Sequence, residues 1–251
     1  MARRIIIACL FGLLSLFTLQ AQEPETITTE FKIFGIGKDG FQDLFYNSGT
    51  EYHELKFHRT HRSPTTYTYE GHRQFSIFVR NPDFDPEDPL SPAFIAIASH
   101  MLKENGGRRL LILAAGRGNR KKAEANRSFR IFEVNDSPDH FARNSIIVLN
   151  ATGARLFGLV SEQRITLPTG VSEPIAYEGS DGSTGATRIA FALETKAGPK
   201  LVMSNDLKLP NNRRILLILQ PPRRSNSLRI DVRMLSESMF PVDEDAATKS
   251  D

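Results

Sequence analysis

The sequence predicts an all-β protein built from two tandem β-sandwich domains related by internal duplication. Three observations predict this fold. Apolar residues after the N-terminal segment come in short alternating runs, turn residues separate the runs, and the second half of the chain repeats blocks of the first. The runs are rich in Phe, Ile, Val and Tyr, which favour strands. None of them holds the period of 3.6 residues that a long amphipathic helix requires.

The first predicted strand places Ile27, Thr29, Phe31 and Ile33 on one face, because successive side chains of a strand point to opposite faces. The Asn-Ser-Gly sequence at 47–49 then predicts a hairpin turn. The other strands that we predict in the first half cover residues 41–46, 52–59, 65–69, 74–80, 93–102, 109–114 and 128–134.

Three short blocks recur in the same order in the second half of the chain. They are Tyr-Glu-Gly at 69–71 and 177–179, Arg-Arg with four apolar residues at 108–113 and 213–218, and Ser-x-Arg-Ile at 128–131 and 227–230. This alignment pairs Arg109 with Arg214. A polar, turn-rich segment at 135–140 separates the copies. We therefore predict domains at 24–136 and 140–240.

Two sandwiches of about 100 residues in tandem resemble the immunoglobulin-like domains of many exported bacterial proteins. The resemblance is one of fold and covers residues 26–238. It implies roughly seven to nine strands in each copy. The Cys…Trp…Cys core of true immunoglobulin domains is absent, since the chain contains no Trp and one Cys.

Residues 1–21 have the pattern of a secretory signal peptide, in which Arg3 and Arg4 precede an apolar run. The run is shorter than the roughly 20 residues that span a bilayer. We therefore expect cleavage after Ala21, export to the periplasm or the exterior, and no transmembrane segment in the mature chain. The competing interpretation is an uncleaved anchor helix. Cleavage would remove Cys9 and leave a mature chain without cysteine, which excludes disulfides and thiol catalysis.

Charge gives no reason to expect nucleic-acid binding. The chain has 32 Lys and Arg against 29 Asp and Glu, and the loss of Arg3 and Arg4 with the signal peptide would leave it nearly neutral. Residues 241–251 are acidic and are predicted to form a disordered tail.

The chain lacks the common catalytic signatures: the Gly-x-Ser-x-Gly elbow, His-Glu-x-x-His, the phosphate loop and the dinucleotide fingerprint. Catalytic triads also assemble from distant residues, so this absence only lowers the expectation of an enzyme. We expect a protein without catalytic role and without cofactor.

Two clusters are weak candidates for a metal site. Alternation along the strand predicted at 52–59 puts His53 and His58 on opposite faces, so a site made of Glu54, His58 and His61 needs a bend there. The acidic loop at 81–89 offers a second set of oxygen ligands, suited to calcium, from Asp83, Asp85 and Glu87. The plainer interpretations are a polar strand end and a solvated loop.

Two predicted hairpin tips, at equivalent positions in the two copies, are basic. The candidate anion-binding residues are Arg117, Arg120, Lys121 and Lys122 in the first copy and Arg223 and Arg224 in the second. Basic tips attract phosphates, carboxylates and sulfates. The plainer interpretation is that the charges keep an exposed turn soluble.

These observations favour an exported, non-catalytic interaction or structural module of the cell envelope, which binds a protein partner through strand edges and loops. The alternative is a module that binds anionic glycans or lipid head groups through the basic tips. A third hypothesis is an enzyme or metal protein that uses His53, His58 and His61. Fold alone does not choose between these functions.

Overall fold

The computed structural model describes residues 26–37, 40–103, 106–116, 126–178, 186–222, 224 and 227–239. The predicted signal peptide at 1–21 and the predicted tail at 241–251 lie outside these residues. Among the described residues there is no α-helix, and strands make up most of the chain. No helix in the described part of the chain is long and apolar enough to cross a membrane.

Seventeen strands follow one another along the described chain. They are β1 (Thr26–Ile36), β2 (Phe45–Ser48), β3 (Glu51–Glu54), β4 (Tyr67–His72), β5 (Gln74–Arg80), β6 (Phe94–Met101), β7 (Arg108–Ala115), β8 (Phe129–Asn135), β9 (Ser145–Asn150), β10 (Leu156–Val160), β11 (Gln163–Leu167), β12 (Gly170–Val171), β13 (Ile175–Ala176), β14 (Thr187–Thr195), β15 (Gly198–Leu207), β16 (Arg213–Gln220) and β17 (Asp231–Ser238). The prediction of an all-β protein is confirmed.

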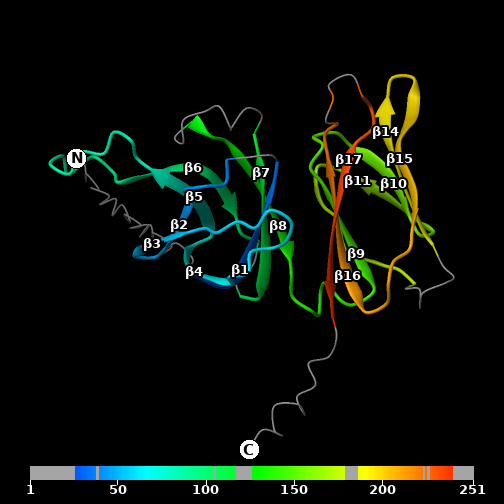
Figure 1. The fold of residues 1–251 in the computed structure, drawn as a ribbon, viewed down its shortest axis with the longest axis horizontal. Coiled ribbons are helices and arrows are strands. Elements are labelled where there is room, and N and C mark those ends of the chain that lie inside the picture. Colours follow the sequence, from blue (N-terminus) through cyan, green and yellow to red (C-terminus); the bar gives the residue numbers. More distant parts are fainter. Residues whose placement is uncertain are drawn as a thin grey trace, which may run out of the picture.

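The strands form two sandwich-like halves with the same strand order (Figure 1). In the first half, the inner sheet β4-β1-β7-β8 packs against the outer sheet β3-β2-β5-β6. In the second half, the inner sheet is β12-β9-β16-β17, with β13 also beside β9, and the outer sheet is β11-β10-β14-β15. The first strand of each half runs parallel to the second-to-last, as β1 with β7 and β9 with β16. The repeated topology agrees with the repeated sequence blocks.

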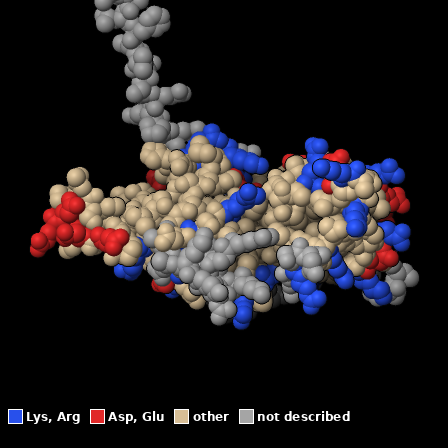
Figure 2. Space-filling view, turned by 90° about the horizontal axis from the view of Figure 1, so that it is seen from above, with Lys and Arg blue, Asp and Glu red and all other residues tan. Residues whose placement is uncertain are grey.

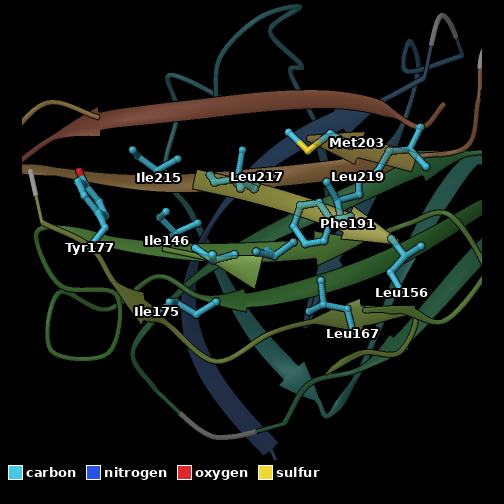
Figure 3. Close-up of a cluster of buried hydrophobic side chains, with 14 of the residues drawn as sticks. Ile146, Leu156, Leu167, Ile175, Tyr177, Phe191, Met203, Ile215, Leu217 and Leu219 are labelled. Atoms are coloured by element: carbon cyan, nitrogen blue, oxygen red, sulfur yellow. The ribbon is translucent and has the colours of Figure 1, made fainter. Parts of the chain in front are cut away.

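Each half has its own hydrophobic core between its two sheets. In the first half, Phe31 of β1 and Phe75 of β5 pack in this core, and both are almost fully buried. In the second half, Ile146, Phe191 and Leu217 converge from β9, β14 and β16, as Figure 3 shows. These cores fix the outer sheets on the inner ones.

A third core joins the two halves to each other. Phe34 of β1 and Ile112 of β7 pack with Ile147 of β9 and Ile218 of β16, and all four are fully buried. Phe141, from the segment between β8 and β9, lies in the same core. The two inner sheets therefore face each other, and the molecule is a stack of four sheets (Figure 1).

The third core shows that the alignment of the two copies differs by one residue from the alignment that the sequence blocks predict. The sequence blocks pair Arg109 with Arg214, but Arg109 ion-pairs with Glu133 beside the first core, whereas Arg214 points between the halves. Leu110 of β7 and Leu216 of β16 both lie in the shared core, so these two are the equivalent positions. A shift of one residue moves every side chain of a strand to the other face.

Candidate functional site

A cluster of buried charges holds the two halves together at one end of the stack. Asp136, only 1% exposed, accepts hydrogen bonds from Arg62 at 2.7 and 2.8 Å and from Arg214 at 3.4 Å. Glu237 accepts from Arg214 Nε at 2.7 Å and lies 3.1 Å from Arg62. Burial alone would raise the pKa of Glu237, but the guanidinium groups of Arg62 and Arg214 hold it below its usual value.

This cluster fixes the direction of the strands that carry the predicted basic loops. Arg108, the first residue of β7, lies 4.0 Å from Asp136, and Arg214 at the start of β16 contacts the same carboxylate. Both strands therefore start at the cluster and run away from it in the same direction (Figure 1). The connections from β7 to β8 and from β16 to β17 consequently leave the described strands at the same, opposite end of the molecule.

The end opposite the cluster gathers positive charge from several loops. Of the predicted anion-binding residues, the exposed Arg224 is described, whereas Arg117, Arg120, Lys121, Lys122 and Arg223 lie outside the described residues. Arg127, before β8, donates from Nη1 to the Gln42 carbonyl at 2.8 Å. Arg155, which directly precedes β10, and Arg229, which shortly precedes β17, are further described arginines near this end. Figure 2 looks at this end and shows Lys and Arg spread over both halves, with a group of acidic side chains at the left tip and further acidic side chains among the basic ones on the right.

The acidic loop between β5 and β6 uses its carboxylates to shape its own turns. Asp85 Oδ1 accepts from the Glu87 amide at 2.9 Å, and Asp88 Oδ1 accepts from the Leu90 amide at the same distance. Such local bonds are typical of Asp in turns. In the described part of the chain, no three His, Cys, Asp or Glu side chains come together as a metal site requires. Asp83, Asp85 and Glu87 therefore do not converge on a calcium site.

The histidine cluster also differs from the prediction. The strand predicted at 52–59 ends at Glu54, so His58 and His61 lie in the loop that follows β3. Their rings stack on each other with centroids 4.2 Å apart, while His53 lies beside the Tyr46 ring. Within the described part of the chain, Glu54, His58 and His61 do not come together as a metal site. Because the chain leaves the sheet at Leu55, the alternation of side chains along a strand no longer predicts where His58 and His61 point.

The sequence did not predict a polar cleft in the first half, where the outer sheet meets β4 of the inner sheet. The cleft has a volume of about 550 Å³ and lies between the β2–β3 turn, the end of β4 and the start of β5. Its lining residues include Asn47, Ser48, Glu70, Gln74 and Phe78. The sequence predicted only a turn at 47–49. It did not predict the cleft, because a cleft depends on where neighbouring strands stop pairing.

The outer sheet of the second half carries a different hollow, which is mostly apolar. Phe157 and Leu159 of β10 and Leu201 of β15 line it, and its volume is about 490 Å³. Leu201 is 62% exposed. It belongs to β15, which pairs only with β14 and so has one open edge.

No protein-family model matches the chain, and no curated protein matches it in sequence.

Proposed function

We propose that the protein is an exported, non-catalytic module of the cell envelope that binds anionic groups through the end where both basic loops emerge. The observation that supports this proposal is the common direction of β7 and β16, which start at one ion cluster. Phosphates, carboxylates and sulfates share the chemistry that such a surface attracts, and arginine bonds them through two parallel N–H groups.

The rigid joint between the halves strengthens this proposal. Two basic loops on one body act as a bivalent binder, because binding by the first raises the effective concentration of the second. The shared core around Phe34 and Ile147 prevents the halves from separating, so the spacing between the strand ends is fixed. An anionic polymer or membrane surface presents many charges and therefore satisfies both loops at once.

The test uses the chain from Gln22 onward and two anionic probes at low and high salt. Vesicles of phosphatidylglycerol, with phosphatidylcholine vesicles for comparison, represent lipid head groups, and polygalacturonate represents an acidic glycan. Arg223 and Arg224 are replaced by Ser, alone and together with serines at the four basic positions of the first loop. The matched control replaces Arg143 and Arg164, two exposed arginines near the ion-cluster end, by Ser.

We expect the variant of Arg223 and Arg224 to weaken binding several-fold, the combined variant to weaken it further, and added salt to abolish it. The control should bind like the parent. Equal losses in the control and the loop variants, or no binding to either probe at low salt, would refute the proposal. Binding to one probe alone identifies lipid or glycan as the source of the anion.

A protein partner is the second candidate, and the apolar hollow beside β15 favours it. Exposed apolar patches next to an open strand edge are typical of docking sites for an added strand. Cross-linking of the mature chain in its native envelope tests this candidate. Repeated capture of one discrete protein through Lys200 of β15, lost in Leu201→Glu, would support it. Capture that is unchanged in this variant would count against it.

A further inference from the structure

We infer that the polar cleft of the first half binds a neutral oligosaccharide. This site lies in the first half between the β2–β3 turn of the outer sheet and β4 of the inner sheet, away from the basic residues of the proposed function, so the two proposals stand or fall separately.

The cleft exists because β2 leaves its sheet early. β2 pairs with β5 only at Phe45–Phe78 and Tyr46–Ile77. Beyond Tyr46 the β2–β3 hairpin turns toward β4, where Ser48 Oγ accepts a hydrogen bond from the Glu70 amide at 3.4 Å. The backbones of β2 and β5 therefore diverge and open a space between them.

The side chains that line this space are suited to hydroxyl groups. Asn47 and Gln74 offer planar amides and Glu70 offers a carboxylate, and within the described part of the chain these three side chains have no hydrogen-bonding partner. The two amides can donate to and accept from adjacent hydroxyls of a sugar ring, and the carboxylate can accept from them. Among the described residues, the cleft lining contains one carboxylate and neither Lys nor Arg, which favours a neutral ligand over an anionic one.

An aromatic strip continues from the cleft across the outer face of the sheet. The Phe78 ring forms part of the cleft wall and meets Tyr52 edge to face, with centroids 5.1 Å apart. Tyr52 in turn stacks on Phe94 at 4.0 Å and is 40% exposed. Sugar rings carry apolar C–H faces that pack on aromatic rings, so a ligand bound in the cleft can extend over this strip.

The second half serves as an internal comparison. Its strand β10, which occupies the place of β2, pairs with β14 at all five of its residues, from Leu156 to Val160. The outer face there carries an apolar hollow in place of a polar cleft. Because the two halves share one topology, the fold itself does not require the cleft. Its polar lining is therefore a property of the first half's own sequence.

The test titrates the chain from Gln22 onward with cellohexaose, maltohexaose and chitohexaose, followed by calorimetry and saturation-transfer NMR. The first variant combines Asn47→Ala with Gln74→Ala, and the second is Tyr52→Ala. The control is Thr166→Ala, an exposed position on the outer sheet of the second half. Circular dichroism and the melting temperature check that each variant keeps its fold.

We expect at least one hexasaccharide to bind, with magnetisation transfer to its ring protons, and both cleft variants to weaken it by about tenfold or more. The control and the basic-loop variants should bind like the parent. Three results would overturn the inference: no binding at millimolar sugar, binding that the cleft variants leave unchanged, or capture of a protein partner through Gln74 without sugar binding.

Discussion

At the scale of single residues, one carboxylate joins the two halves of the protein. Asp136 directly follows β8, so it belongs to the segment where the sequence predicts a polar link. The structure buries it between Arg62 of the first half and Arg214 of the second. A buried charge is tolerated only when it is paired and hydrogen-bonded. The link is therefore part of the interface between the halves.

The substitution Asp136→Asn tests this role. It removes the negative charge between two nearly buried guanidinium groups, and breaking a buried pair in this way costs about 3–5 kcal/mol. We expect a large loss in the free energy of unfolding, measured by urea denaturation. The control is Asp206→Asn, which breaks the exposed pair between Asp206 and Arg188 and should change stability little. Equal effects of the two substitutions would contradict the assignment.

The dependence of stability on pH follows from Glu133 and Glu237. Burial would raise the pKa of Glu133, but hydrogen bonds from His100 and the Lys103 amide, with the charge of Arg109, lower it below its usual value. The pKa of Glu237 is lowered by Arg62 and Arg214. A carboxyl whose pKa is lower in the folded state stabilises the protein above its unfolded pKa of about 4.3. That stability is lost as the pH falls through the folded pKa.

We therefore expect the free energy of unfolding to be nearly constant around neutral pH and to fall below about pH 5. Glu133→Gln should lose stability at pH 7 and show a shallower decline in acid, because it no longer takes up a proton on unfolding. Glu173→Gln, at a side chain that is 90% exposed, should follow the parent curve. Melting temperatures between pH 3 and 7 measure the three curves, and parallel curves for Glu133→Gln and the parent would refute the assignment.

At the scale of elements, the sequence predicted which side chains of a strand face the core where only one face of the strand is buried. It did not predict this where both faces are buried. Ile27 and Phe31 alternate with polar neighbours, and the predicted face is the buried one. In β7 and β16 both faces are buried, so apolar residues follow one another without alternation. Such a run identifies a strand but does not show which of its residues face which core. This ambiguity explains the one-residue error that paired Arg109 with Arg214.

The candidate sites were less predictable, because they depend on where strands end and which loops meet. Strand β3 ends at Glu54 although apolar Leu55 and Phe57 continue the pattern, so strand alternation did not predict the positions of His58 and His61. The cleft beside Asn47 arises where pairing between β2 and β5 stops, which no local pattern in either strand records. The basic loops were visible as charge in the sequence. Their common end follows only from the ion cluster around Asp136.

Packing within the second half makes Gly158 of β10 a sensitive position. A Cβ atom at this residue would lie 2.6 Å from Cε1 of the buried Phe191 ring and 2.9 Å from Cγ1 of Ile165. Gly158→Ala should therefore overpack the core and cost about 1–3 kcal/mol. Thr166→Ala on the neighbouring strand β11 is exposed and should cost less than about 0.5 kcal/mol. Chemical denaturation compares the two, and a neutral Gly158→Ala would show that Phe191 moves freely.

At the scale of the whole molecule, two identical topologies pack through the same face of their inner sheets. This arrangement resembles a symmetric dimer joined into one chain, since equivalent strands such as β7 and β16 meet across the interface. The interface is a hydrophobic core with ion pairs at one end, and linked domains with large apolar interfaces do not move independently. The four sheets should thus unfold as one unit.

The two halves can be produced separately, as one fragment of residues 24–136 and another of residues 140–240. The duplicated sequence alone predicts that each fragment folds by itself. The shared core predicts otherwise, because a lone first half exposes Phe34 and Ile112 and a lone second half exposes Ile147 and Ile218. Each fragment should aggregate or stay poorly structured, and an equimolar mixture should regain the two-dimensional NMR spectrum of the full chain.

A surface variant separates two causes of such a failure. Phe34→Ser with Ile112→Ser makes the centre of the apolar face of the first fragment polar, while Ile36, Leu110, Phe132 and Val134 remain on it, and leaves the core between its own sheets intact. If the sandwich is stable and only its exposed face is adhesive, this fragment becomes a folded monomer by gel filtration and circular dichroism. If it remains unfolded, the interface itself completes the fold. Unmodified fragments that are monomeric and melt cooperatively alone would show that the shared core contributes little, and the halves would then be independent domains.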